Sequence, residues 1–182
     1  MSIPVVVFAY NRPYHLRKCL DSIFSYADLN VYRVHVVIDG PKEESNQSVT
    51  DLVFREAESH PVVSEVTIRQ ENLGLSRSII RGVSEVLETS TSIIVLEDDL
   101  VIHSDFFRFM RKGLEAYENN KKVAAIQGFS LTSIISRSNP YFLQGADCWG
   151  WATWRDRWKF FEKDPNKLLE LLRKKHLKIG RA

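Results

Sequence analysis

Short apolar runs alternate with amphipathic segments along most of the chain. Residues 3–9 (IPVVVFA) are almost wholly apolar, which is typical of a strand buried on both faces. Pro13 can begin a helix, because apolar residues then recur at helical spacing. The same order is repeated downstream. We predict further strands at 31–38, 65–69, 92–96 and 123–127, and further helices at about 44–59, 75–87, 104–117 and 165–177.

This alternation predicts an α/β fold with a mostly parallel central sheet and helices on both of its faces. Ser104 is placed to cap one of the helices. The pattern changes after residue 128, where residues 129–148 have the composition of a loop and a group of tryptophans follows. We therefore expect an α/β unit at residues 1–128 and a second part of the same structural domain at residues 129–182.

Composition and charge narrow the class of protein. A chain of 182 residues is long enough for one α/β domain, or for the larger part of a bigger one. The net charge is only +2, so we expect no nucleic-acid partner. Basic residues gather late in the chain, where a solvated helix face is the simplest reading and a membrane or polyanion contact is the alternative. These residues are Arg173, Lys174, Lys175, Lys178 and Arg181.

The cysteines and the apolar runs indicate the cellular compartment in which the protein is expected. Cys19 and Cys148 lack the spacing of a metal site and are most simply reduced thiols. The apolar run at residues 3–9 is too short for a signal peptide or a membrane span. We expect a cytoplasmic protein, with a peripheral contact at the inner membrane face left open.

Three carboxylates, Glu97-Asp98-Asp99, follow directly on the apolar strand predicted at 92–96. Adjacent acids repel one another, and at ~4 Å and an effective dielectric of ~20 each unit pair is worth about 4 kcal/mol. Ligands of open α/β sheets bind at the carboxyl ends of the strands. Oxygen ligands suit Mg²⁺ or Mn²⁺, which bind through one or two carboxylates plus phosphates. We expect such a metal here, and the alternative is that the acids cap a helix or lie in a loop.

Other polar residues follow the neighbouring strands. Arg12 and Asp39 come after the first and second strands, so a parallel sheet would bring them to the same edge as the acids. Arg12 could bind phosphate oxygens in bidentate fashion, and Asp39 could accept hydrogen bonds from a base or ribose. Arg77 lies in the first turn of a helix, where a cation opposes the helix dipole, so a nearby anion is expected.

Aromatic residues form the last group of candidates. Trp149 and Trp151 lie among glycines, which leave ring faces open, and we expect them to form the wall of a substrate pocket. Trp154 and Trp158 follow at helical spacing and are as well explained by a core position.

Several short segments resemble known enzymes when they are taken in order. The set consists of Arg12, Arg17-Lys18-Cys19-Leu20-Asp21, Asp39, Asn72-Leu73-Gly74-Leu75, Glu97-Asp98-Asp99-Leu100, Asp105-Phe106-Phe107 and Trp149-Gly150-Trp151-Ala152-Thr153-Trp154. It resembles N-acetylglucosaminyltransferase I-like enzymes and bacterial family 2-like glycosyltransferases over roughly residues 3–158. The acidic triplet with its flanks and the tryptophan segment are its most specific parts.

The resemblance implies a GT-A fold, a nucleotide-diphospho-sugar donor with a UDP-sugar favoured, and Mn²⁺ or Mg²⁺. By position it implies that Arg12 contacts the diphosphate and Asp39 the base. It further implies that Glu97 faces the donor sugar, Asp98 the ribose and Asp99 the metal. The first part of the chain would bind the donor and the second would face a glycan, lipid-linked or protein acceptor. The implied function is inverting transfer of a sugar to a hydroxyl, as in polysaccharide biosynthesis.

Two features depart from these families. Asn11 stands where the first family tends to have an aspartate. The general base of these families comes after the tryptophan segment, and no residue here matches it. Asp147, Asp156 and Glu170 are weak candidates that read equally well as surface or capping acids. We therefore expect a C-terminally truncated transferase that binds its donor and transfers poorly.

Three alternatives differ in function. A catalytically incomplete module would bind a nucleotide-sugar without transferring it. A sugar-phosphate nucleotidyltransferase would have a glycine-rich basic loop after the first strand, where this chain has Ala9-Tyr10-Asn11. Phosphoaspartate proteins would have acids at the same place, so the sequence argues against both of these enzyme classes.

Overall fold

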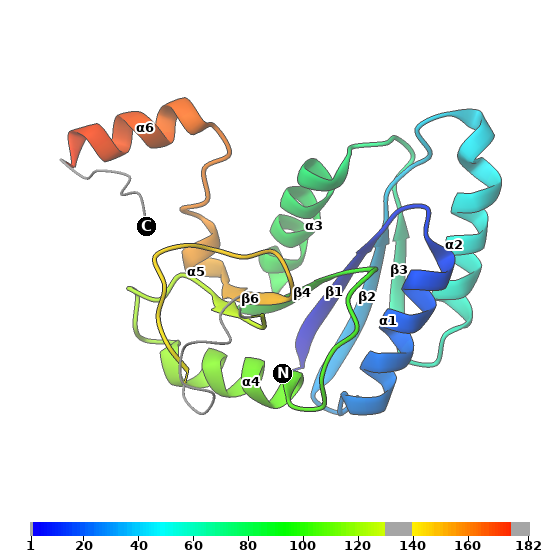
Figure 1. The fold of residues 1–182 in the computed structure, drawn as a ribbon, viewed down its shortest axis with the longest axis horizontal. Helices are drawn as coiled ribbons and strands as arrows, with labels where there is room; N and C mark the ends of the chain where they lie inside the picture. The colour runs from blue at the N-terminus through cyan, green and yellow to red at the C-terminus, as the bar shows by residue number, and fades with distance from the viewer. Residues whose placement is uncertain (1, 130–139, 176–182) are drawn as a thin grey trace.

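Six strands pair into one sheet in the order β3-β2-β1-β4-β6-β5 (Figure 1). The structure is a computed structural model that describes residues 2–129 and 140–175. Strands β3, β2, β1 and β4 are parallel, whereas β6 is antiparallel to both β4 and β5. The strands are β1 (Ile3–Ala9), β2 (Tyr32–Ile38), β3 (Val63–Ile68), β4 (Ser92–Glu97), β5 (Ile126–Gln127) and β6 (Trp151–Trp154).

Helices cover both faces of this sheet, as the sequence predicts. Successive residues of β1 point to opposite faces. Val5 and Val7 pack with α1, α2 and α4, while Val6 and Phe8 pack with α3. The helices are α1 (Pro13–Tyr26), η1 (Glu44–Asn46), α2 (Gln47–Ser59), α3 (Leu75–Thr89), α4 (Phe106–Tyr117), α5 (Arg155–Trp158) and α6 (Pro165–Lys174).

The structure corrects several local predictions. The strand predicted at 123–127 is only Ile126–Gln127, because β6 inserts between β4 and β5 and pairs with those two residues alone. Strand β6 itself was not predicted. Asp105, and not Ser104, is the N-cap of α4, and its side chain makes no capping hydrogen bond.

Part of the predicted loop (130–139), the last residues predicted for the final helix (176–177) and the basic residues Lys178 and Arg181 lie outside the described residues. Among the helices of residues 2–129 and 140–175, none is long and apolar enough to cross a membrane.

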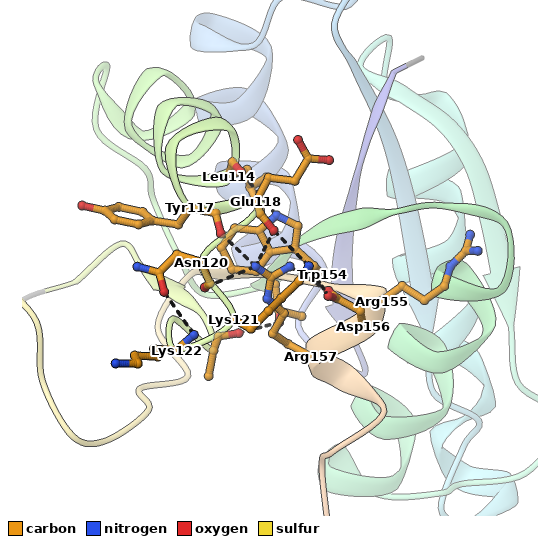
Figure 2. A network of polar contacts seen from close by, with 12 residues as sticks. Leu114, Tyr117, Glu118, Asn120, Lys121, Lys122, Trp154, Arg155, Asp156 and Arg157 are labelled. Carbon is orange, nitrogen blue, oxygen red and sulfur yellow. Dashed lines mark hydrogen bonds and ion pairs between the residues drawn. The ribbon is translucent and has the colours of Figure 1, made fainter.

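A buried arginine ties the end of the sheet to α4 (Figure 2). The Arg157 guanidinium donates to the carbonyl oxygens of Tyr117 and Glu118 at 2.8 and 2.6 Å and to a carboxylate oxygen of Asp156 at 2.7 Å. It also lies 4.1 Å from the ring centroid of Trp154 in β6. A cation at the C-terminus of a helix satisfies its free carbonyls and complements its dipole. Arg157 therefore holds β6 and α4 together.

We expect Arg157→Met to lower the free energy of unfolding by about 2–4 kcal/mol, because it removes the charge-assisted hydrogen bonds from a buried guanidinium to two carbonyls and a carboxylate while keeping most of the side-chain volume. Arg55→Met, at an exposed arginine of α2, is the matched control and should change stability by no more than about 0.5 kcal/mol. Urea unfolding of both variants measures the difference. Equal stability of the two variants would show that the Arg157 contacts contribute nothing.

Candidate functional site

The parallel strands bring the predicted polar residues to one edge of the sheet. Ala9 of β1 is level with Ile38 of β2, and Phe8 is level with Glu97 of β4. The residues that follow stay joined across the edge, since the Asp39 N–H donates to the Ala9 carbonyl at 2.9 Å and the Asp98 N–H to the Phe8 carbonyl at 3.0 Å. The carboxyl ends of β1, β2 and β4 therefore lie side by side at one edge of the sheet.

Arg12 contacts two of the three acids. Its guanidinium donates to a carboxylate oxygen of Asp98 and, at 2.9 Å, to one of Asp99. The Asp98 side chain is 2% exposed, whereas those of Arg12 and Asp99 are 43% and 41% exposed. The second oxygen of Asp98, Oδ2, is buried and has no hydrogen-bond partner among the described residues. A buried carboxylate oxygen without a partner is costly, so this oxygen has the capacity to accept a hydrogen bond or to bind a cation.

Burial and mutual repulsion raise the pKa values of these acids. Burial is the largest cause of the raised pKa of Asp98, and Arg12 opposes it. Burial also raises the pKa of Glu97, and the negative charges of Asp99 and Asp98 add to the effect. The Cys148 thiol hydrogen-bonds to Glu97 and lowers its pKa in part. One exposed arginine thus faces three crowded acids, an arrangement that favours binding of a further cation.

Asp39 stabilises the loop that leads into α3 through hydrogen bonds. Its carboxylate accepts hydrogen bonds from the backbone N–H groups of Leu73, at 3.0 Å, and Gly74, at 2.8 Å, and the residue is 4% exposed. Gly74 has φ +73°, a left-handed conformation that favours glycine. Arg77 is exposed in the first turn of α3, and no ion pair joins it to an acid within the described part of the chain.

The turn before β6 reaches the same edge. The backbone N–H of Gly128 donates to the Gly150 carbonyl at 2.7 Å, and that of Asp147 donates to the Gln127 side-chain oxygen at 3.2 Å. Trp149 is 48% exposed and stacks edge-on against Phe129, with 4.6 Å between the ring centroids. Cys148 of this turn contacts Glu97, so its neighbours Asp147 and Trp149 also lie near the acids.

Trp151 has a different environment. It lies in β6 opposite Val95, on the face of the sheet that α3 covers. Its ring stacks on that of Trp158 at 5.8 Å, and the Trp158 indole donates to the Ser84 hydroxyl of α3 at 2.9 Å. The structure therefore places Trp151 in the packing between the sheet and α3, apart from Trp149.

The other weak candidates for the base lie elsewhere. Strand β6 is antiparallel, so its last residue, Trp154, is level with Ser92 at the start of β4. Asp156 follows it at the opposite edge of the sheet from the acids, where it pairs with Lys121 at 2.5 Å and with Arg157. Glu170 is exposed on α6. Of the three candidates, the structure brings only Asp147 to the edge with the acids.

Cys148 is the site residue that sequence reasoning missed. Its thiol lies against Glu97, and burial and the charge of Glu97 raise its pKa. Nothing in the sequence signals this contact, because it depends on β6 pairing with β4, a long-range event.

The acids suit a divalent cation that keeps part of its water shell. The described residues contain no group of three or more His, Cys, Asp or Glu side chains arranged as a complete metal site. Mg²⁺ and Mn²⁺ bind through one or two carboxylates with phosphates and water filling the remaining positions. Asp99, at the exposed rim, with the unpartnered Oδ2 of Asp98 behind it, fits this partial kind of site.

A model of the family described as "Glycosyl transferase family 2" matches residues 5–176, nearly the whole chain. The chain belongs to glycosyltransferase family 2. The GT-A fold and the family expected from the sequence are thereby confirmed.

The chain is similar to solved structures of glycosyltransferases. A mannosyltransferase from Pyrobaculum calidifontis, in complex with GDP-Man and Mn²⁺, is 21% identical with a TM-score of 0.51, over 68% of this chain and 34% of that one. TarS from S. aureus is 15% identical with a TM-score of 0.47, over 65% of this chain and 33% of that one. Glucosyl-3-phosphoglycerate synthase from Mycobacterium tuberculosis is 19% identical with a TM-score of 0.46, over 62% and 39%. The chain spans about a third of the length of the first of these structures.

The raised pKa of Glu97 predicts a pH-dependent gain in stability for Glu97→Gln. Folded Glu97 keeps its proton to a higher pH than unfolded Glu97, so it lowers stability as the pH rises from about 4 through its raised pKa. Without divalent cations, Glu97→Gln should therefore be more stable than the parent chain at pH 7, and the difference should vanish towards pH 4.

Urea unfolding at both pH values measures this difference. Glu58→Gln, at an exposed acid of α2, is the control and should show no gain that depends on pH. A Glu97→Gln variant less stable than the parent chain at pH 7 would contradict the repulsion among these acids.

Proposed function

We propose that this chain binds a nucleotide-diphospho-sugar together with a divalent metal, as the donor-binding part of a glycosyltransferase that acts on a hydroxyl acceptor. One observation carries the proposal. A buried carboxylate with an unpartnered oxygen, an exposed carboxylate and an exposed arginine meet at the carboxyl edge of the sheet, in Asp98, Asp99 and Arg12. Membership of family 2 supports it.

In this proposal Asp99 holds Mn²⁺ or Mg²⁺, because its carboxylate lies at the exposed rim of the site. The metal, when bound, supplies positive charge that stabilises a departing nucleoside diphosphate. The Pyrobaculum mannosyltransferase was solved with GDP-Man and Mn²⁺, which makes a nucleoside diphosphate with Mn²⁺ the first ligand pair to test, and we favour a UDP-sugar as donor.

Arg12 exchanges one of its partners when the donor binds. The side chains of Arg12 and Asp99 are 43% and 41% exposed, so the contact between them is screened by water and is weak enough to be replaced. A guanidinium presents paired donors that match phosphate oxygens. Arg12 would thus exchange Asp99 for the diphosphate while keeping Asp98, Asp99 would be free to hold the metal, and Arg77 at the start of α3 would add a second cation.

The remaining donor contacts follow from position. Asp98 takes the ribose and Glu97 faces the donor sugar, both at the end of β4. Asp39 contacts the base through the capacity left by its two backbone hydrogen bonds. Residues 1–128 supply this donor side.

The acceptor side lies in residues 129–182, whose strand β6 belongs to the same sheet. The half-exposed Trp149 is suited to stack on a sugar face, and Asp147, at the same edge of the sheet as the acids, is our candidate for the general base. We propose a glycan, lipid-linked or protein hydroxyl as acceptor, in polysaccharide biosynthesis. Two free cysteines, Cys19 and Cys148, support a cytoplasmic setting.

The alternative is a module that binds the donor without transferring the sugar. The positions of the other two base candidates favour this alternative, because Asp156 lies at the opposite edge of the sheet and Glu170 is exposed on a helix without buried residues. Incubation with a UDP-sugar and Mn²⁺, followed by measurement of released UDP, separates the two. Release above the level of an Asp99→Asn variant supports a transferase, and binding without release supports the module.

We expect Mn²⁺ and UDP together to raise the melting temperature by several degrees, since a ligand present at about 100 times its Kd stabilises the folded state by about 2.7 kcal/mol. Asp99→Asn should lose most of the Mn²⁺-dependent part of this shift, because it removes the exposed carboxylate. Asp51→Asn, on the surface of α2, is the matched control and should keep the shift.

Thermal unfolding with a panel of nucleoside diphosphates, with and without Mn²⁺, measures these shifts. The donor-site proposal fails if no nucleotide stabilises the parent chain, or if Asp99→Asn responds as the parent chain does.

A further inference from the structure

Helix α6 carries an apolar stripe that the described part of the protein does not cover. The helix spans Pro165–Lys174 and contains no buried residue. Leu168, Leu169 and Leu171 are 42%, 39% and 48% exposed. Figure 1 shows α6 held away from the sheet and from the helices that cover it. The late basic residues, which the sequence alone suggests lie on a solvated face, thus share a helix with exposed leucines.

Basic residues border the apolar stripe of α6 on both sides, and its acid lies on the opposite face. Leucines at 168, 169, 171 and 172 follow the i, i+3, i+4 spacing of one helix face. Lys167 lies one turn before Leu171, and Arg173 lies one turn after Leu169, so a basic side chain borders each edge of the stripe. Glu170 lies on the opposite face.

We propose that α6 lies in the surface of an anionic lipid bilayer, with its leucines at the acyl boundary. Long basic side chains at both borders can keep their charges among anionic headgroups while their stems lie along apolar surface. The acid on the far face remains in water. Burial of the stripe against protein would not require cations along both borders, and it is this charge distribution that favours lipid.

The charged groups around the stripe are compatible with this partner. Lys167 Nζ lies 3.7 Å from a Glu162 carboxylate oxygen, a long and exposed contact that a headgroup can replace. Lys174 and Lys175 add positive charge at the end of the helix. Because α6 is short, its binding depends on both apolar burial and anionic lipid. The proposal is independent of the donor site.

Vesicle flotation of the whole chain tests the proposal. Vesicles of phosphatidylcholine with about a third phosphatidylglycerol should bind the chain at least tenfold more tightly than phosphatidylcholine alone, and high salt should remove the difference. Binding that is equal on both kinds of vesicle, or absent from both, overturns the proposal.

Variants of α6 separate the two contributions. Leu168→Gln combined with Leu171→Gln should weaken binding to anionic vesicles by about tenfold or more. The matched control combines Leu29→Gln with Leu52→Gln, at exposed leucines outside α6, and should bind as the parent chain does. Since α6 has no buried residue, the melting temperature should not change, which verifies folding.

Removal of the bordering charges gives the second variant. Lys167→Gln combined with Arg173→Gln should weaken binding by about fivefold for each basic side chain removed. Arg55→Gln combined with Lys112→Gln, at exposed positions of α2 and α4, is the control for net charge. If both pairs weaken binding equally, general charge and not α6 is responsible, and the proposal is wrong.

A second copy of the chain is the competing occupant of the stripe. Light scattering without vesicles should find the parent chain and the leucine variant in the same oligomeric state. A dimer of the parent chain that the leucine variant dissociates would assign the stripe to self-association and overturn the lipid proposal.

Discussion

Carboxylates crowded at the end of a buried strand must be balanced by positive charge, and the site is organised around this requirement. β4 ends in three acids, and Arg12 from the end of β1 contacts two of them. The balance is incomplete, because burial and mutual repulsion still raise the pKa values of Glu97 and Asp98. A site with surplus negative charge and an exchangeable cation is suited to a metal that arrives with a phosphate ligand.

Strand β6 and the residues on either side of it support this edge of the sheet. β6 inserts beside β4 and carries the turn that brings Cys148 against Glu97. Arg157, buried against Trp154, fixes the far end of β6 to the last turn of α4. Residues that are remote from the acids in sequence therefore support the site through one short antiparallel strand.

The parts of the fold that could be predicted are those with a strong local pattern. The apolar run of β1, the helical spacing of α1 and the strand that ends in the acids all lie within one or two residues of their predicted bounds. β6 could not be predicted, because Trp151–Trp154 is too short for a clear alternation and forms only by pairing with distant strands. The same pairing shortens β5.

The functional site also contains a part that could be predicted from the sequence and a part that could not. Residues that come directly after parallel strands, Arg12, Asp39 and the acids, could be placed on one edge from topology alone. Contacts that depend on β6 could not be predicted, which is why the sequence did not indicate Cys148 or the packing of Trp151 against α3.

The most direct test of the account is a titration of Mn²⁺, followed by electron paramagnetic resonance, on the parent chain and on Arg12→Gln, each with and without UDP. If Arg12 exchanges Asp99 for the diphosphate, Arg12→Gln binds Mn²⁺ alone more tightly than the parent chain and gains less from UDP. A parent chain whose affinity for Mn²⁺ is unchanged by UDP would contradict the account.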